Sequence, residues 1–265
     1  MSRPLAELRT AGPDPELESR AFGRWLLSEA DVDAPEGLIT VAGSDDGGRV
    51  PWASRADWVI VPRGEELLLA SLSGARTERG ENLAGEERAR VALAAAEAGT
   101  QLPLTEDVLW LRGALVRAVL MAGALEQISE LSLAHARERQ QFGRPIGFFQ
   151  AVQAHLVTIA QQAALVGAAA DAAVAREGAA FETATAKLLA GRAAVIATRA
   201  AHQVHGAVGV TREHPLGVQT RRLWAWRGEY GDERHWARRL GEAVDSAGPD
   251  RLYPAITAGS RELEV

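Results

Sequence analysis

The fold is decided by the run Arg139-Gln-Gln-Phe-Gly-Arg-Pro-Ile-Gly-Phe-Phe-Gln-Ala-Val-Gln153, which separates two long segments of helical apolar periodicity. Phe142, the glycine after it and Pro145 are expected to end the first helix, and the second is expected to begin near Gly147. One helix–helix corner therefore gathers an arginine fork suited to a pyrophosphate, an aromatic face and the amide of Gln150. By itself, such a run is more typical of a helical hairpin with a polar tip.

A second corner is expected downstream, where Gln203-Val-His-Gly-Ala-Val-Gly209 ends another helix. Glycine supplies left-handed backbone angles and lets the main chain approach a ligand closely. Gly206 is therefore a candidate for ligand contact. The alternative is an ordinary helix C-terminus capped by Gly206, and both interpretations can hold together. The methyl group of Ala207 still allows a ligand to approach the backbone closely only if the backbone dihedral angles of Ala207 stay negative.

The composition indicates a helix-rich protein with a substantial core. The chain has 265 residues, of which 47% are hydrophobic and only 5% aromatic. This length allows one large domain or two smaller ones. The absence of cysteine excludes disulfides, iron–sulfur clusters and thiol catalysis, and fits a reducing cytosol. The net charge of −6 argues against a nucleic-acid partner, so any bound phosphate needs local donors.

No signal peptide or membrane span is expected. Residues 1–10 are polar and lack an apolar core, so the expected location is the cytoplasm. Residues 147–170 carry no formal charge, yet polar side chains interrupt them: Gln150, Gln153, His155, Gln161 and Gln162. Because their desolvation disfavours a lipid-facing span, we expect a buried helix of a soluble protein.

Four regions are expected along the chain. Residues 1–37 form a residual N-terminal helical segment, loose at first and then helical from Pro15 after the cap Asp14. Residues 38–102 form a partial β-domain, with strand-like runs at 38–42, 58–62 and 67–72. Residues 91–93 are a further strand candidate, although alanine-rich 86–97 fits a helix equally well. Residues 103–248 form a helical bundle, and residues 249–265 form a polar tail.

Three long helices and two shorter ones are expected in the bundle. The first starts at the cap Thr105 and repeats apolar residues at steps of three or four: Val108, Leu111, Leu115, Val119, Ala122, Leu125, Ile128 and Leu131. The next two are expected at about 149–166 and 182–205, and the shorter ones at 216–227 and 232–244. Such a set is typical of an up-down bundle. The spacing of His202, His205, His214 and His235 predicts no metal site.

Taken in order, these motifs resemble the C-terminal helical domain of the acyl-CoA dehydrogenase family. They are Arg139-x-x-Phe-Gly-x-Pro-Ile-x-x-Phe-Gln-x-x-Gln, Ala-Lys187, Gln203-x-His-Gly-x-x-Gly, Glu213-x-Pro and Arg221. The resemblance is good over about residues 103–244 and weak over 38–102. It implies a mainly α protein, whose C-terminal up-down helical bundle of the acyl-CoA dehydrogenase type is preceded by a small, truncated β-domain.

The resemblance implies FAD as the cofactor. In the family, the positions matching the first corner reach across a subunit interface to the FAD of a neighbour, and the glycine turn contacts its adenosine–pyrophosphate end. The expected cofactor-binding residues are Arg139, Phe142, Gln150, Gln203, Gly206 and Ala207. The family usually has a second glycine where Ala207 stands. Its usual flavin-contacting strand signature is missing from the β-region.

The catalytic base departs from the family pattern. An acyl-CoA dehydrogenase needs a carboxylate to take the α-proton while the β-hydride goes to flavin. When the spacing of the family motifs is carried over without gaps, Tyr230 stands at the family's loop position for this base and Gly113 at its alternative helix position. Neither residue is a carboxylate. Glu229 lies one residue early, and a one-residue slip turns a helical side chain by about 100°. A base at Glu229 and an ordinary solvated glutamate both remain open.

Three functional hypotheses follow. In the first, the chain resembles the smaller subunit of two-gene acyl-CoA dehydrogenases, a kind known in actinobacterial steroid side-chain degradation. It would then complete the FAD site of a second subunit, in a hetero-oligomer that oxidises an acyl-CoA to the 2,3-enoyl-CoA. In the second, it is a self-sufficient short dehydrogenase, in a homo-oligomer, with Glu229 as base. In the third, it is a structural helical protein that has lost FAD.

Overall fold

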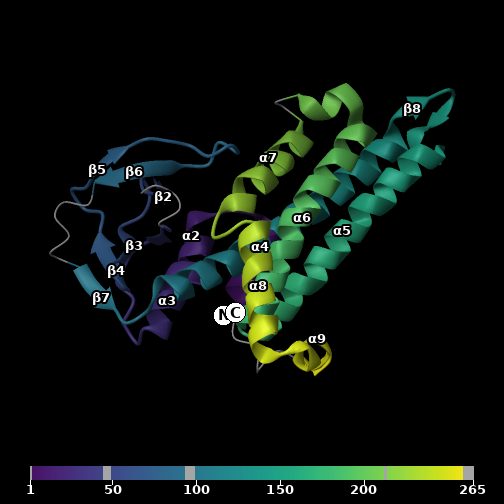
Figure 1. Cartoon of the computed structure of the whole chain (residues 1–265). Coiled ribbons are helices and arrows are strands. Elements are labelled where there is room, and N and C mark those ends of the chain that lie inside the picture. The colour runs from purple at the N-terminus through teal and green to yellow at the C-terminus, as the bar shows by residue number, and fades with distance from the viewer. Residues whose placement is uncertain (1, 44–48, 93–98, 212–213, 259–265) are drawn as a thin grey trace.

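The computed structural model describes residues 2–43, 49–92, 99–211 and 214–258, so Glu213 of the family motif lies outside the described residues. Small sheets occupy one end of the molecule and a bundle of long helices the other (Figure 1). The long helix α4 (Glu106–Glu138) leads from the strands into the bundle. The chain is therefore mainly α, with the small β-part preceding the bundle, as the sequence predicts.

Residues 2–11 are helical, whereas the sequence predicts a loose segment over the first thirteen residues. Helix α1 (Ser2–Ala11) buries Leu5 and Leu8 completely, and it packs on α4. Leu5 and Leu8 are one helical turn apart, so both face the core. Three short helical elements follow: α2 (Pro15–Glu18), the π-helical η1 (Ser19–Gly23) and α3 (Arg24–Glu29). Asp14 caps α2 as expected, because its side chain accepts the backbone N–H groups of Glu16 and Leu17.

Two small sheets form the β-part. One has the order β1-β3-β4-β7 and the other β2-β6-β5. The first contains β1 (Ile39–Val41), β3 (Trp58–Arg63), β4 (Glu66–Ser71) and β7 (Gly99–Leu102), and β1 pairs parallel to β3. The second contains β2 (Arg49–Pro51), β5 (Arg76–Glu78) and β6 (Arg88–Ala92), so the ambiguous segment near Val91 is a strand. Strands β2, β5 and β7 had no clear apolar alternation in the sequence.

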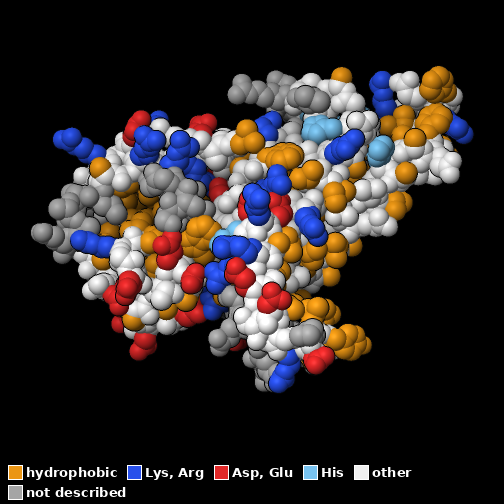
Figure 2. All heavy atoms as spheres, viewed as in Figure 1, with side chains coloured by type: hydrophobic (Ala, Val, Ile, Leu, Met, Phe, Trp, Pro, Cys, Tyr) orange, Lys and Arg blue, Asp and Glu red, His pale blue; other side chains and the backbone are white. Residues whose placement is uncertain are grey.

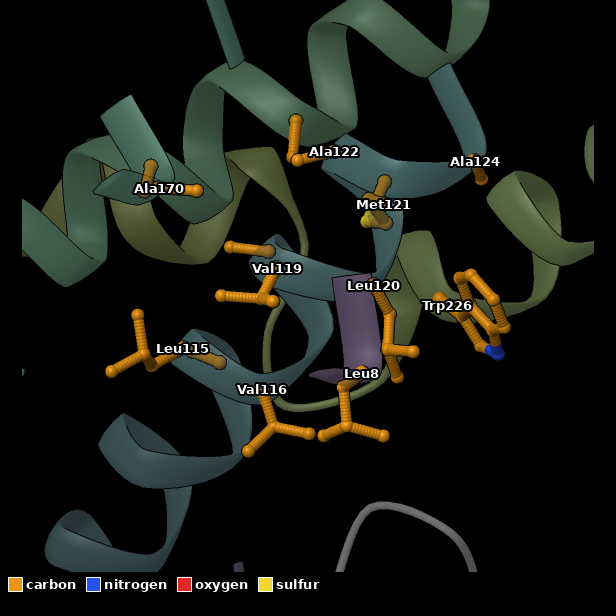
Figure 3. Packing of buried hydrophobic residues seen from close by; sticks show 14 of the residues in the cluster. Leu8, Leu115, Val116, Val119, Leu120, Met121, Ala122, Ala124, Ala170 and Trp226 are labelled. Atoms are coloured by element: carbon orange, nitrogen blue, oxygen red, sulfur yellow. The ribbon is translucent and has the colours of Figure 1, made fainter. Parts of the chain in front are cut away.

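The bundle is built around α4, which is completely buried over much of its length. Residues Leu115, Val116, Val119, Leu120 and Met121 pack with Leu8 of α1 and Trp226 (Figure 3). Helix α4 packs against α5 (Gln150–Ala175), α6 (Ala180–His205) and α7 (Pro215–Gly228), and α6 also packs against α8 (Glu233–Ala247). The many alanines on α5 and α6 allow their backbones to lie close together.

Helix α5 differs from the expected buried helix. Both α4 and α5 are long and apolar enough to cross a membrane by length and composition alone. The apolar window of α4 is 78% buried, but that of α5 is only 33% buried. Val157 and Leu165 of α5 are 55% and 45% exposed. Apolar periodicity shows that α5 has an apolar face, but the sequence alone does not say whether this chain covers it.

The C-terminal residues include a helix where the sequence analysis expected a polar tail. After α8 come the 3-10 turn η4 (Pro249–Arg251) and α9 (Leu252–Ala258), which projects from the bundle (Figure 1). Tyr253 and Ile256 of α9 are 75% and 64% exposed. Residues 259–265 lie outside the described part of the chain.

Candidate functional site

The first corner is a tight hairpin at the end of α4. Arg139 is the C-cap of α4, and two short strands follow it, β8 (Gln140–Gln141) and β9 (Arg144–Pro145). The backbone N–H of Ile146 donates to the carbonyl oxygen of Arg139 at 2.8 Å, which closes the hairpin. Helix α5 then begins at Gln150. Arg139 and Gln150 are both exposed, so their donors are open to a ligand.

Phe142 occupies the tip of this hairpin in a strained and exposed position. Its φ is +51° and that of Gly143 is +77°. Positive φ at both central residues is typical of two-residue hairpin turns, whose twist matches that of the antiparallel strands they join. A non-glycine residue there costs about 1–2 kcal/mol. The Phe142 side chain is 92% exposed, and its ring meets that of Phe149 edge-on, with ring centroids 6.0 Å apart. An exposed aromatic ring held in a strained turn is typical of a binding position.

The second corner is the end of α6. Gly206 caps the helix with a φ of +60° and a ψ of −145°, which only glycine adopts readily. Gln203, Gly206 and Ala207 are all exposed, and Ala207 keeps a negative φ within the 3-10 turn η3 (Gly206–Val210). The methyl group of Ala207 is therefore accommodated without backbone strain. Both interpretations of Gly206 from the sequence, cap and ligand contact, remain compatible with this geometry.

The two corners lie at the same end of the bundle and touch through two histidines. The ring of His135, one turn before Arg139, stacks on that of His205, which precedes Gly206; the centroids are 4.5 Å apart. Figure 2 shows hydrophobic and basic side chains at the exposed tip of the hairpin. All six sequence-predicted cofactor residues are exposed in the structure.

The family's two positions for a catalytic base are in contact with each other. A β-carbon placed on Gly113 would lie 2.7 Å from Cε1 of Tyr230 and closer still to Cγ and Cδ1, so the ring lies directly on the helix backbone. Tyr230 is 1% exposed, its hydroxyl donates to the carbonyl oxygen of Val41 at 3.2 Å, and its ring meets Phe22 edge-on. A cavity of about 10 Å³ beside Phe22 and Val41 has room for one water molecule at most.

Glu229 lies in a buried ion network. Its Oε1 accepts from Arg88 at 2.7 Å and its Oε2 from Arg117 at 2.5 Å, and the residue is 8% exposed. Burial alone would raise the pKa of the Glu229 carboxyl, but the two guanidinium groups together hold it below its ordinary value. A carboxylate with both oxygens engaged and a lowered pKa is a weak proton acceptor. The solvated alternative from the sequence is wrong, because Glu229 is buried.

The network continues beyond Glu229 and balances its charge. Arg117 also pairs with Glu18 at 3.2 Å, and Glu86 accepts from Trp226 Nε1 at 2.8 Å and pairs with Arg222 at 3.3 Å. Sequence reasoning missed these residues. The available signal was Arg117, a charged residue in the most apolar part of α4, since such a residue is rarely buried without a partner.

Lys187 holds the loop that carries Glu229 and Tyr230. Its ammonium group donates to the carbonyl oxygens of Arg227 at 2.8 Å and Gly231 at 2.6 Å, and the residue is 1% exposed. Burial lowers the pKa of Lys187 to about 8, although Glu229 and Glu233 partly oppose this. The lysine of the Ala-Lys motif therefore fixes the backbone between α7 and α8.

Comparison with known proteins shows which family the bundle resembles. Residues 111–230 match the family model described as acyl-CoA dehydrogenase, C-terminal domain. Fewer than half of the residues lie in this match, so it shows what this part of the chain is similar to. The chain is 31% identical over 127 residues to the acyl-CoA dehydrogenase IpdE2 of Mycolicibacterium smegmatis, a match that covers 48% of this chain and 40% of that relative. It is 34% identical over 171 residues to FadE34 of Mycobacterium tuberculosis, covering 57% of this chain and 23% of that relative.

Solved acyl-CoA dehydrogenase structures share the fold. The ChsE4-ChsE5 complex of Mycobacterium tuberculosis gives a TM-score of 0.72 at 21% identity, covering 92% of this chain and 79% of that chain. A steroid acyl-CoA dehydrogenase variant, Tcur3481-Tcur3483, gives 0.68 at 24% identity, covering 82% and 64%. At this identity the likeness establishes the fold alone. Within the described ranges, no group of three His, Asp or Glu side chains has the geometry of a metal site.

Proposed function

We propose that this chain is a non-catalytic acyl-CoA dehydrogenase subunit that completes the FAD site of a second subunit. FAD supplies the hydride acceptor when bound, and the partner supplies the carboxylate that removes the α-proton. Arg139, Gly206 and Gln203 of this chain bind and orient the diphosphate end of the cofactor, while Phe142 and Gln150 cover it. The substrate of the assembly is an acyl-CoA thioester, either a fatty acyl or a steroid side-chain acyl group.

The observation that carries this proposal is the packing of Tyr230 on Gly113. A self-sufficient dehydrogenase needs room beside its base for the α-carbon of the thioester and for the flavin ring. Here both base positions are filled by one buried contact, and Glu229 is engaged by Arg88 and Arg117. By contrast, the two corners that carry the predicted cofactor residues are exposed. We refer to these residues, Arg139, Phe142, Gln150, Gln203, Gly206 and Ala207, together as the cofactor corner. One end of the family's site is thus closed and the other open, as a subunit that lends residues to its neighbour requires.

The exposed face of α5 supports the presence of a partner. Val157 and Leu165 of α5 and Ile196 of α6 are between 43% and 55% exposed. Leaving such apolar side chains in water forgoes about 25 cal/mol for each Å² that a partner would cover. Helix α5 begins at the cofactor corner, so a subunit that covers α5 also brings its own cofactor near Arg139 and Gln150.

Co-expression tests the proposal directly. The chain is purified alone and together with the acyl-CoA dehydrogenase encoded nearest to it. Two quantities are measured: the visible absorption of bound flavin and the reduction of a dye that depends on acyl-CoA. We expect the chain alone to be colourless and inactive, and the complex to be yellow and active. Arg139→Ala is expected to lower the flavin content of the complex several-fold. Arg137→Ala is the matched control, because Arg137 is exposed on the same last turn of α4.

Two results would contradict the proposal. Flavin and dye reduction in the chain alone, both lost in Glu229→Gln, would establish a self-sufficient enzyme. A flavin content of the complex that Arg139→Ala leaves unchanged would indicate a structural protein whose cofactor corner has lost its role.

A further inference from the structure

Three histidines from three different elements pack together beneath the cofactor corner. His135 lies in the last turn of α4, His205 ends α6, and His214 is the N-cap of α7. The rings of His135 and His205 are stacked at 4.5 Å with an interplanar angle of 19°, and the ring of His214 meets His205 edge-on at 5.1 Å. The cluster thus ties together the helix ends that carry Arg139 and Gly206.

The hydrogen bonds define which nitrogen atoms remain available. The Nδ1 of His205 donates to the carbonyl oxygen of Ala201 at 2.9 Å, so this atom carries the proton of the neutral ring. His205 is 4% exposed, and its buried Nε2 has no hydrogen-bond partner among the described residues. The Nδ1 of His214 accepts the backbone N–H of Leu216 at 3.1 Å, which leaves its Nε2 to carry a proton. A buried acceptor without a partner is costly unless a hydrogen-bond donor reaches it.

The charges around the cluster oppose its protonation. Burial lowers the pKa of His205, and His135, His214 and His202 lower it further, although the hydrogen bond to Ala201 acts in the opposite direction. Burial likewise lowers the pKa of His135, with His214 and Arg139 adding to it and Glu138 opposing it. The nearby groups on α4 and α6 are therefore mostly positive or become positive on protonation. An anion arriving beside Arg139 would reverse this balance.

We propose that the His135–His205–His214 cluster couples proton uptake to the binding of a diphosphate group at the Arg139–Gly206 corner. This inference rests on the proposed function, because it concerns the same corner. A diphosphate dianion beside Arg139 stabilises an imidazolium at His135, which lies one helical turn before Arg139 and stacks on His205. The corner therefore binds diphosphates more tightly as the pH falls from 8 to 6.

The coupling is measured by calorimetric titration of the full chain with ADP and with inorganic pyrophosphate at pH 6 and pH 8. Repeating each titration in two buffers of different ionisation enthalpy counts the protons taken up. Uptake of one proton over a pKa change of one unit corresponds to about tenfold tighter binding. Both probes also take up protons in this pH range, so their own protonation is measured in the same buffers and subtracted. We expect about that gain at pH 6 for both probes after this correction.

His135→Phe preserves a ring that can stack on His205 but cannot take a proton. We expect it to abolish the pH dependence while retaining binding at the level seen at pH 8. His235→Gln is the control, because His235 contacts Trp110 at the start of α4, about 38 Å along the helix from His135. The C2–H resonances of the rings give a second measurement, since pyrophosphate should raise the titration midpoint of His135 and leave that of His235 unchanged.

The inference is overturned if neither probe binds, if binding is equally tight at both pH values, or if His135→Phe retains the pH dependence. Its failure is distinguishable from that of the proposed function. A yellow, active complex without proton-linked diphosphate binding would refute only the histidine coupling. A colourless complex with proton-linked binding of pyrophosphate would refute only the role of the corner in holding FAD.

Discussion

The ring of Tyr230 lies against the backbone of Gly113, so no side chain larger than hydrogen fits at position 113 without displacing it. Tyr230 itself is held in the left-handed region, with a φ of +55°, by Lys187 on the following carbonyl and by its own hydroxyl on Val41. Two contacts from separate elements thus fix one aromatic ring over one glycine. The two family positions for a catalytic base are therefore closed by this contact, whereas the cofactor corner is exposed.

Gly113→Ala is expected to lower the free energy of unfolding by about 1–2 kcal/mol. Overpacking against Tyr230 costs about 1–3 kcal/mol, while replacing a glycine inside a helix returns up to about 1 kcal/mol. Urea unfolding measures the change. Gly241→Ala in α8 is the control, because a β-carbon there meets no atom within 4 Å, and it should stabilise the chain by about 0.5–1 kcal/mol. Equal effects of both variants would mean that Tyr230 moves away freely.

Glu229→Gln is expected to destabilise the chain by about 3–5 kcal/mol, since it leaves Arg88 and Arg117 buried without their shared partner. Because the folded pKa of Glu229 is lowered, its contribution is fully present above the unfolded pKa and is lost as the pH falls through the folded value. The difference between the two proteins should therefore shrink below about pH 4. Exposed Glu242→Gln should change stability by less than about 0.5 kcal/mol. A Glu229→Gln variant as stable as this control would exclude the network as a structural element.

Lys187 predicts a pH dependence of the same sign as Glu229, but at higher pH. Its folded pKa of about 8 lies below the ordinary value of 10.5, so between these values the unfolded chain binds more protons. The free energy of unfolding of the natural chain should therefore rise with pH relative to Lys187→Met, by about 1.4 kcal/mol for each pH unit in this range. Denaturant unfolding at pH 7.5, 8.5 and 9.5 measures the difference. A difference that falls with pH would show that the ammonium form is favoured by folding.

Phe142→Gly separates binding from stability at the hairpin tip. Glycine relieves the strain of the positive φ, about 1–2 kcal/mol, but costs about 0.5–1 kcal/mol of chain entropy. The free energy of unfolding should therefore stay within about 1 kcal/mol of the natural chain. We expect the flavin content of the co-expressed complex to fall, since the exposed ring is lost. Retained flavin at unchanged stability would remove Phe142 from the cofactor-binding residues.

The long helices and both corners could be predicted because their signals are local. Steps of three and four between apolar residues set α4, and Pro145 with the glycine before it set the hairpin. The helical N-terminus and the strands β2, β5 and β7 could not, because they are short and are stabilised mainly by contacts distant in the sequence. Leu5 and Leu8 become a helix face only once α4 is beside them.

The sequence by itself determined the bundle, its two polar corners and the absence of a carboxylate at positions 113 and 230, since these depend on residue type and spacing along one helix or turn. Tertiary structure decided what fills the space between them. Glu229, Arg88, Arg117 and Glu18 come from four distant segments, and a buried charge is stable only where such segments meet with opposite sign. Whether α5 is covered and which histidines touch likewise depended on packing, because apolar periodicity fixes a helix face but not its neighbour.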